Sequence, residues 1–127
     1  MTEHRTPLAR VRGLGSAKSG TEHFWHQRLT AVANVPLTIA FVLIVVSLLG
    51  RNHAAAQQIL GSPLVAIVIL LFIGSVTYHM RIGMQVIIED YVHDDVHKLI
   101  LLMANTFFTV AVALASAFAI LMLSFKV

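Results

Sequence analysis

The sequence of 127 residues contains no cysteine and few charged residues. Without cysteine the chain can form no disulfide and can offer no thiolate to an iron–sulfur cluster. A redox centre held by this chain therefore depends on His, Met or Tyr, or on a partner. Charged residues make up 12% of the chain, whereas about a quarter is usual in soluble domains. This composition excludes a typical soluble globular domain.

Three long intervals contain no Asp, Glu, Lys or Arg: residues 29–50, 52–80 and 99–125. About 20 apolar residues in a helix span a hydrocarbon core of about 30 Å, so each interval can cross a bilayer. We therefore expect an all-α membrane protein with a polar N-terminal tail and interfacial segment over residues 1–28 and a three-helix transmembrane anchor over residues 29–127. The expected transmembrane helices cover about residues 29–50, 63–89 and 98–125. No room remains for a water-soluble catalytic domain.

The distribution of basic residues predicts the orientation of the chain. Five basic residues precede the first expected span, whereas Arg51 is the only one in the connection that follows it. The positive-inside rule therefore predicts a cytoplasmic N-terminal tail and a C-terminus on the other side. The formal net charge of +3 does not indicate nucleic-acid binding, because anionic lipid headgroups explain basic residues beside a span.

Two of the expected spans carry patterns that favour packing against protein. The first span has a stripe of polar residues on one side: Gln27, Thr30, Asn34 and Thr38. We expect this stripe to face protein, because lipid cannot satisfy polar groups. The third span has small residues at intervals of four, which allow another helix to approach closely: Ala111, Ala115 and Ala119.

The second expected span holds the densest group of polar and ionisable side chains, and such groups inside a membrane indicate a functional site. His79 is the main candidate, because neutral imidazole is a common axial haem ligand. Ser75 and Gly83 share its helix face, and these small residues leave a shallow slot for a flat macrocycle. A second axial ligand has to come from another chain. The alternative is that His79 only forms a hydrogen bond to another helix.

Asp90 and Tyr91 form a second candidate site on the same helix. Asp90 lies about 20° from His79 around the helix and roughly 16 Å further along it. A tyrosine hydroxyl can donate to a quinone carbonyl, and a neighbouring carboxylate can orient that donor or help to deliver protons. Anchoring of Tyr91 at the membrane interface is the alternative for that residue. His79, Arg81 and Asp90 also allow a different function, a proton or ion path in a small transporter or channel subunit.

The segment after Tyr91 places His93 and His97 four residues apart, which suits a metal site on a helix. It lacks the Glu after the first His that a zinc hydrolase requires. We expect instead that Asp94 and Asp95 cap the third helix and complement its dipole.

The pattern H-x3-G-x6-D-Y, from His79 to Tyr91 in the second of three spans, resembles the smaller hydrophobic membrane-anchor subunit of succinate dehydrogenase, respiratory complex II. This type of chain is a cytochrome b anchor. Further similarity comes from Tyr91-Val-His-Asp after the motif and from residues around the start of the first span: Gly20, Phe24, Arg28 and Thr30-Ala31. The resemblance covers roughly Gly20 to Val127.

The resemblance implies roles for four residues. His79 would ligate the iron of haem b on one side, and a histidine of the larger cytochrome b anchor subunit would ligate it on the other. Tyr91 would form a hydrogen bond with ubiquinone, and Asp90 would support that site. Arg28 would lie near the haem propionates or the quinone pocket.

The resemblance also implies a subunit that oxidises no succinate itself but helps electrons pass from an iron–sulfur subunit to quinone. The iron–sulfur and flavoprotein subunits would dock on the cytoplasmic side. The complex would serve electron transport and the tricarboxylic acid cycle in a bacterial inner (cytoplasmic) membrane, with the mitochondrial inner membrane as the less favoured location.

Overall fold

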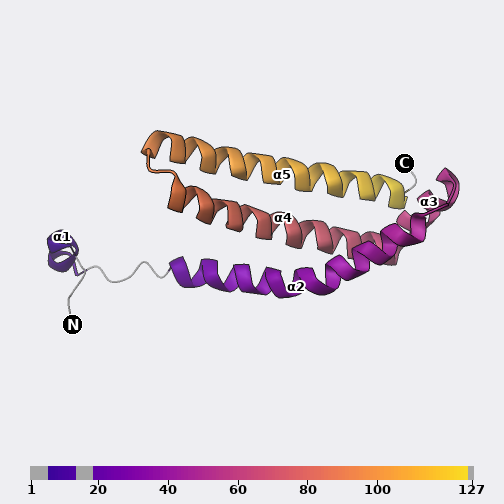
Figure 1. Cartoon of the computed structure of the whole chain (residues 1–127), viewed down its shortest axis with the longest axis horizontal. Helices are drawn as coiled ribbons and strands as arrows, with labels where there is room; N and C mark the ends of the chain where they lie inside the picture. Colours follow the sequence, from indigo (N-terminus) through magenta and orange to yellow (C-terminus); the bar gives the residue numbers. More distant parts are fainter. Residues whose placement is uncertain (1–5, 14–18, 126–127) are drawn as a thin grey trace.

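The computed structural model describes residues 6–13 and 19–125, which form helices and contain no strand. Three helices are long: α2 (Ser19–Leu48), α4 (Pro63–Tyr91) and α5 (Asp95–Phe125). Two are short: α1 (Pro7–Val11) and α3 (His53–Leu60). Helix α4 packs against both α2 and α5, and it lies between them in Figure 1.

The three long helices are long and apolar enough to cross a membrane over Gly20–Leu48, Pro63–Tyr91 and Asp95–Phe125, which contain 29, 29 and 31 residues. At a rise of about 1.5 Å per residue, each exceeds a hydrocarbon core of about 30 Å. The ends of the helices therefore project beyond the core. The expected all-α fold with three membrane-spanning helices is confirmed.

Two helices begin earlier than the hydrophobic intervals indicate. Helix α2 starts at Ser19, so residues 19–28, which we expected in the tail, are helical. Helix α5 starts at Asp95 rather than at Lys98. A hydrophobic interval marks the part of a helix that fits inside the membrane, whereas polar residues can continue the same helix into water.

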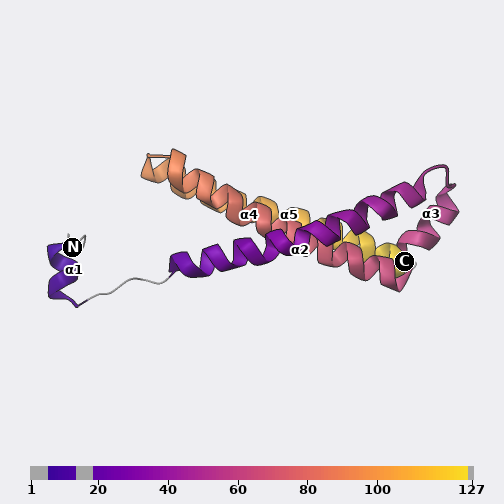
Figure 2. The same cartoon turned by 60° about the horizontal axis from the view of Figure 1, so that its bottom comes forward.

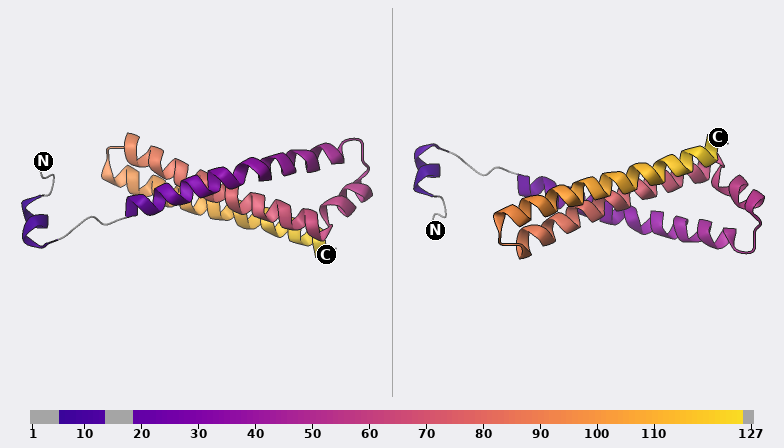
Figure 3. Two further views of the ribbon diagram at one scale, coloured as in Figure 1. Left: turned by 90° about the horizontal axis from the view of Figure 1, so that it is seen from below. Right: turned by 90° about the horizontal axis from the view of Figure 1, so that it is seen from above.

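Helix α2 continues through Pro36, although proline cannot donate the usual helix hydrogen bond to Val32. The second half of the helix turns away from the line of the first half (Figure 1). A proline within a helix is a common cause of such a bend. Helix α2 also crosses the α4–α5 pair at an angle, as Figures 2 and 3 show from other sides.

The connection between α2 and α4 contains helix α3. The Asn52 side chain caps α3 by accepting a hydrogen bond from the Ala55 amide at 2.9 Å. Gly61 ends the helix where the chain passes close to α5. A Cβ atom at position 61 would lie 2.6 Å from the Leu123 carbonyl oxygen, so this approach requires glycine.

The interior of the bundle is small, because most side chains of the long helices face outward. The buried apolar residues all belong to α4: Ala66, Ile69, Ile82 and Ile88. On α5, Thr109 is buried and Asn105 donates to the Arg81 carbonyl of α4 at 3.0 Å. The small residues Ala111, Ala115 and Ala119 of α5 are exposed. No helix in the described part of the chain packs against them.

Candidate functional site

His79 lies half-buried on the side of α4 that faces α2. Its Nδ1 atom is 2.9 Å from the Thr30 hydroxyl of α2. Thr30 belongs to the polar stripe of the first span, in which Gln27 and Asn34 are also half-buried while Thr38 is exposed. The contact with His79 shows that the stripe faces protein at Thr30.

The contacts of the Thr30 hydroxyl are compatible with a proton on Nδ1 of His79. Its oxygen is 2.8 Å from the His26 carbonyl oxygen and 3.2 Å from the Gln27 carbonyl oxygen, so its single proton has acceptors within its own helix. With its proton on one of these carbonyls, the hydroxyl oxygen can accept from Nδ1 of His79. The Nε2 lone pair of His79 has no partner among the described residues. An unshared imidazole nitrogen of this kind can bind a metal ion.

The small residues around His79 leave space that the described part of the chain does not fill. A Cβ atom at Gly83 would meet no atom within 4 Å. The Ser75 hydroxyl is buried and has no hydrogen-bond partner among the described residues, and the same holds for the amide oxygen of Asn34 on α2. Buried polar atoms normally have partners. These two unpartnered oxygen atoms therefore favour a further group at the seam, the contact between α2 and α4, in the assembled protein. Open space therefore lies at Gly83, one turn from His79 on the same helix.

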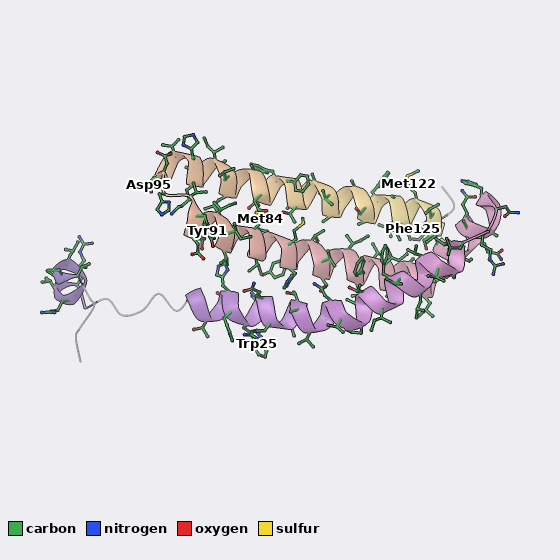
Figure 4. The ribbon with its side chains drawn as sticks, in the orientation of Figure 1. Trp25, Met84, Tyr91, Asp95, Met122 and Phe125 are labelled. Atoms are coloured by element: carbon green, nitrogen blue, oxygen red, sulfur yellow. The ribbon has the colours of Figure 1, made fainter. Side chains whose placement is uncertain are left out.

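Asp90 and Tyr91 lie on the last turn of α4, at the end of the bundle where α5 begins (Figure 4). Tyr91 is 78% exposed, and Asp90 is exposed as well. The side chain of neither residue forms a hydrogen bond with a described residue, whereas the side chain of the neighbouring Glu89 accepts one from Gln85 at 2.8 Å. The structure does not bring these two residues into contact with His79.

Arg28 does not reach the seam between α2 and α4. Its guanidinium lies 5.1 Å from the centre of the Phe24 ring, one turn earlier on the exposed surface of α2. Two positions along a helix correspond to about 200°, so Arg28 and Thr30 project to opposite sides of α2. Trp25 is exposed too, and Figure 4 shows it on the side of α2 away from α4.

Sequence reasoning missed a second contact between α2 and α4. The Tyr78 hydroxyl is 3.2 Å from Nδ1 of His26, and the two rings meet edge to face. Both line a cleft of about 280 Å³ that Arg81 also lines, and the Arg81 Nε atom is buried with no partner among the described residues. The four-residue spacing of His26 and Thr30 was the signal available, because it extends the polar stripe by one turn.

The segment from His93 to His97 forms a helix cap. An Asp94 carboxylate oxygen accepts from the His97 amide at 2.8 Å and lies 2.6 Å from His97 Nδ1. Both hydrogen bonds lower the pKa of Asp94 from its ordinary value, and the bond from the His97 amide has the larger effect. The capping role expected for Asp94 is confirmed. Within residues 6–13 and 19–125, no three His, Cys, Asp or Glu side chains gather as a metal site would require.

These observations define the class: a small three-helix membrane protein that carries an imidazole with a free nitrogen between two of its helices. Comparisons with known proteins agree with this class. The profile of the succinate dehydrogenase/fumarate reductase transmembrane subunits matches residues 2–122. The chain belongs to this family, and the resemblance to a succinate dehydrogenase membrane anchor is confirmed.

Individual relatives carry matching descriptions. A succinate dehydrogenase hydrophobic membrane anchor subunit of Paracoccus denitrificans is 30% identical over 87% of this chain and 85% of the relative. The corresponding subunit of Rickettsia bellii is 30% identical over 89% of this chain and 90% of the relative. A succinate dehydrogenase membrane anchor subunit of Reclinomonas americana is 34% identical over 65% and 72%. No solved structure gives a significant match.

Proposed function

We propose that the chain is the smaller membrane-anchor subunit of a succinate:quinone oxidoreductase. It helps to bind haem b and ubiquinone, so that electrons from the iron–sulfur subunit reach quinone, and it oxidises no succinate itself. The observation that carries the proposal is the His79 imidazole, whose Nδ1 contacts Thr30 while Nε2 has no partner among the described residues. Membership of the family supports the same function.

The residues around His79 fit a haem group. His79 would ligate the iron through Nε2, and the open space at Gly83 would admit the edge of a flat ring. The second axial ligand would come from the larger cytochrome b anchor subunit. When bound, haem b supplies a one-electron carrier. Arg28 projects to the opposite side of α2, so its role at the propionates or the quinone pocket depends on a partner chain that covers that side.

Tyr91 and Asp90 fit a quinone site that partner subunits complete. The Tyr91 hydroxyl has no partner among the described residues, so it is free to donate to a quinone carbonyl. Asp90 is the adjacent carboxylate that would orient this donor or relay protons. Both residues lie at a helix end, where protons from water are accessible.

The proposed setting is a bacterial inner membrane, with the N-terminus of the chain in the cytoplasm. The distribution of basic residues supports this orientation. It places Tyr91 on the cytoplasmic side, because α4 runs back towards the end of the bundle where α2 begins (Figure 1). The iron–sulfur and flavoprotein subunits would dock on that side.

The optical spectrum of the purified whole complex tests the proposal. We expect a b-type haem in the reduced-minus-oxidised difference spectrum, and we expect its loss or a large change in the His79→Ala variant. His53→Ala is the matched control, because His53 opens α3 outside the three spans and is exposed. A His79→Ala complex with an unchanged haem spectrum would remove the ligand assignment.

A further inference from the structure

The hydrogen bond between Thr30 and His79 is the one polar side-chain contact that the candidate haem ligand makes among the described residues. The atoms are 2.9 Å apart and come from different helices, separated by 49 positions in sequence. Both side chains are half-buried. A polar contact in such surroundings is screened little by solvent, so it can hold the imidazole in one rotamer.

The other contacts of Thr30 allow it to accept this bond. Its own proton has acceptors in the His26 and Gln27 carbonyls of the same helix, at 2.8 and 3.2 Å. An imidazole that binds a metal through Nε2 carries its proton on Nδ1. The Thr30 oxygen can accept that proton while its own proton stays on a carbonyl of α2.

We propose that Thr30 is a positioning residue that fixes the tautomer and ring orientation of His79, so that Nε2 is ready for the haem iron. This inference depends on the proposed function, because it concerns the ligand that the function requires. Metal-ligating histidines usually donate their second ring N–H to an oxygen, which orients the ring and raises the basicity of the ligating nitrogen. A more basic axial imidazole favours ferric over ferrous iron.

Thr30→Val tests the assignment, because valine has the shape of threonine without its hydroxyl. The helix bond from the residue 30 amide to the His26 carbonyl is kept, so the substitution removes mainly the cross-helix contact. In the whole purified complex we expect a higher haem midpoint potential, altered g-values in the electron paramagnetic resonance spectrum, and roughly 10-fold faster haem loss to an apoprotein acceptor. Thr30→Ser restores the hydroxyl and should return all three readouts towards wild type.

Thr106→Val is the matched control. Thr106 is half-buried, and its hydroxyl donates to the Leu102 carbonyl of its own helix at 3.0 Å but bonds to no other helix in the described part of the chain. We expect this variant to keep the wild-type potential. If Thr30→Val does not assemble, Thr30→Ala removes the same hydroxyl with a smaller side chain and takes its place.

The outcomes separate this inference from the proposed function. A wild-type complex without haem would overturn the proposed function and the role of Thr30 together. A haem that keeps its potential, its resonance spectrum and its rate of loss in Thr30→Val or Thr30→Ala would overturn the positioning role alone. Equal shifts in Thr30→Val and Thr106→Val would also overturn it, because they would reflect general loosening of the bundle.

Discussion

The two candidate sites on α4 differ in how much of each this chain provides. His79 is half-buried and is held by Thr30 from the neighbouring helix. Tyr91 is 78% exposed at the end of the same helix, and its hydroxyl has no hydrogen bond to a described residue. The first candidate site is oriented within this chain, whereas the second would need partner subunits to enclose a quinone.

This contrast follows from the positions of the two residues along one helix. His79 lies where α2 and α4 pack together, and Thr30 provides it with a polar partner within the bundle. Tyr91 lies on the last turn of α4, where water can satisfy its hydroxyl; in the proposed function a quinone and partner chains would replace that water. Substitutions should therefore act on the haem through the internal packing of the chain, and on quinone through the exposed helix end.

We expect the largest effect from Tyr91→Phe, and we expect it on quinone turnover. We expect quinone turnover by the whole complex to fall by roughly 10²-fold, because a positioned hydrogen-bond and proton donor is lost. Electron transfer from succinate to a soluble artificial acceptor should stay intact, since those electrons do not need the quinone site. Steady-state assays with both acceptors measure the difference.

The other tyrosine of α4 provides the control for that experiment. The Tyr78 hydroxyl is bonded within the chain to His26, so Tyr78→Phe should leave quinone turnover close to wild type. Loss of both activities in Tyr91→Phe would indicate failed assembly instead. Equal quinone turnover in the wild type and in Tyr91→Phe would favour the alternative role of Tyr91, anchoring at the membrane interface.

Gly83→Leu should remove most of the haem without destabilising the chain. The space at Gly83 contains no atom within 4 Å of a Cβ, and exchanging glycine for leucine within a helix gains up to about 1 kcal/mol. The added side chain lies about 40° from His79 around α4, so it fills the slot beside the imidazole. Haem content per assembled complex, measured as the pyridine haemochrome, checks the prediction.

Gly74→Leu is matched to this change, because position 74 is equally open but about 140° from His79. We expect the Gly74→Leu complex to retain its haem. If both glycine variants lost haem to the same degree, the effect would come from crowding between helices or subunits in general, and the slot would lie elsewhere.

The sequence predicts the three spans because their hydrophobic length is a local property that burial in lipid requires. It also identifies Thr30 and His79 as polar residues on packed helix faces. It does not predict their pairing, because the register between two helices depends on packing along their whole length. Pro36 illustrates the same limit, since local rules predict that proline disturbs the helix but not the direction in which the helix bends.

The smallest effect concerns Asp94, which caps α5 just beyond the Tyr91 end of α4. Hydrogen bonds from His97 lower the Asp94 pKa, so the carboxylate stabilises the first turn of α5 above its ordinary pKa. This contribution is lost as the pH falls through the lowered folded-state pKa, in the acid range. Amide hydrogen exchange of His97 should accelerate there, and Asp94→Asn should flatten the dependence while His79 and its haem spectrum stay unchanged. A haem spectrum that followed the same acid transition would contradict the separation of the two sites along α4, because it would couple the exposed end of the bundle to the seam held by Thr30.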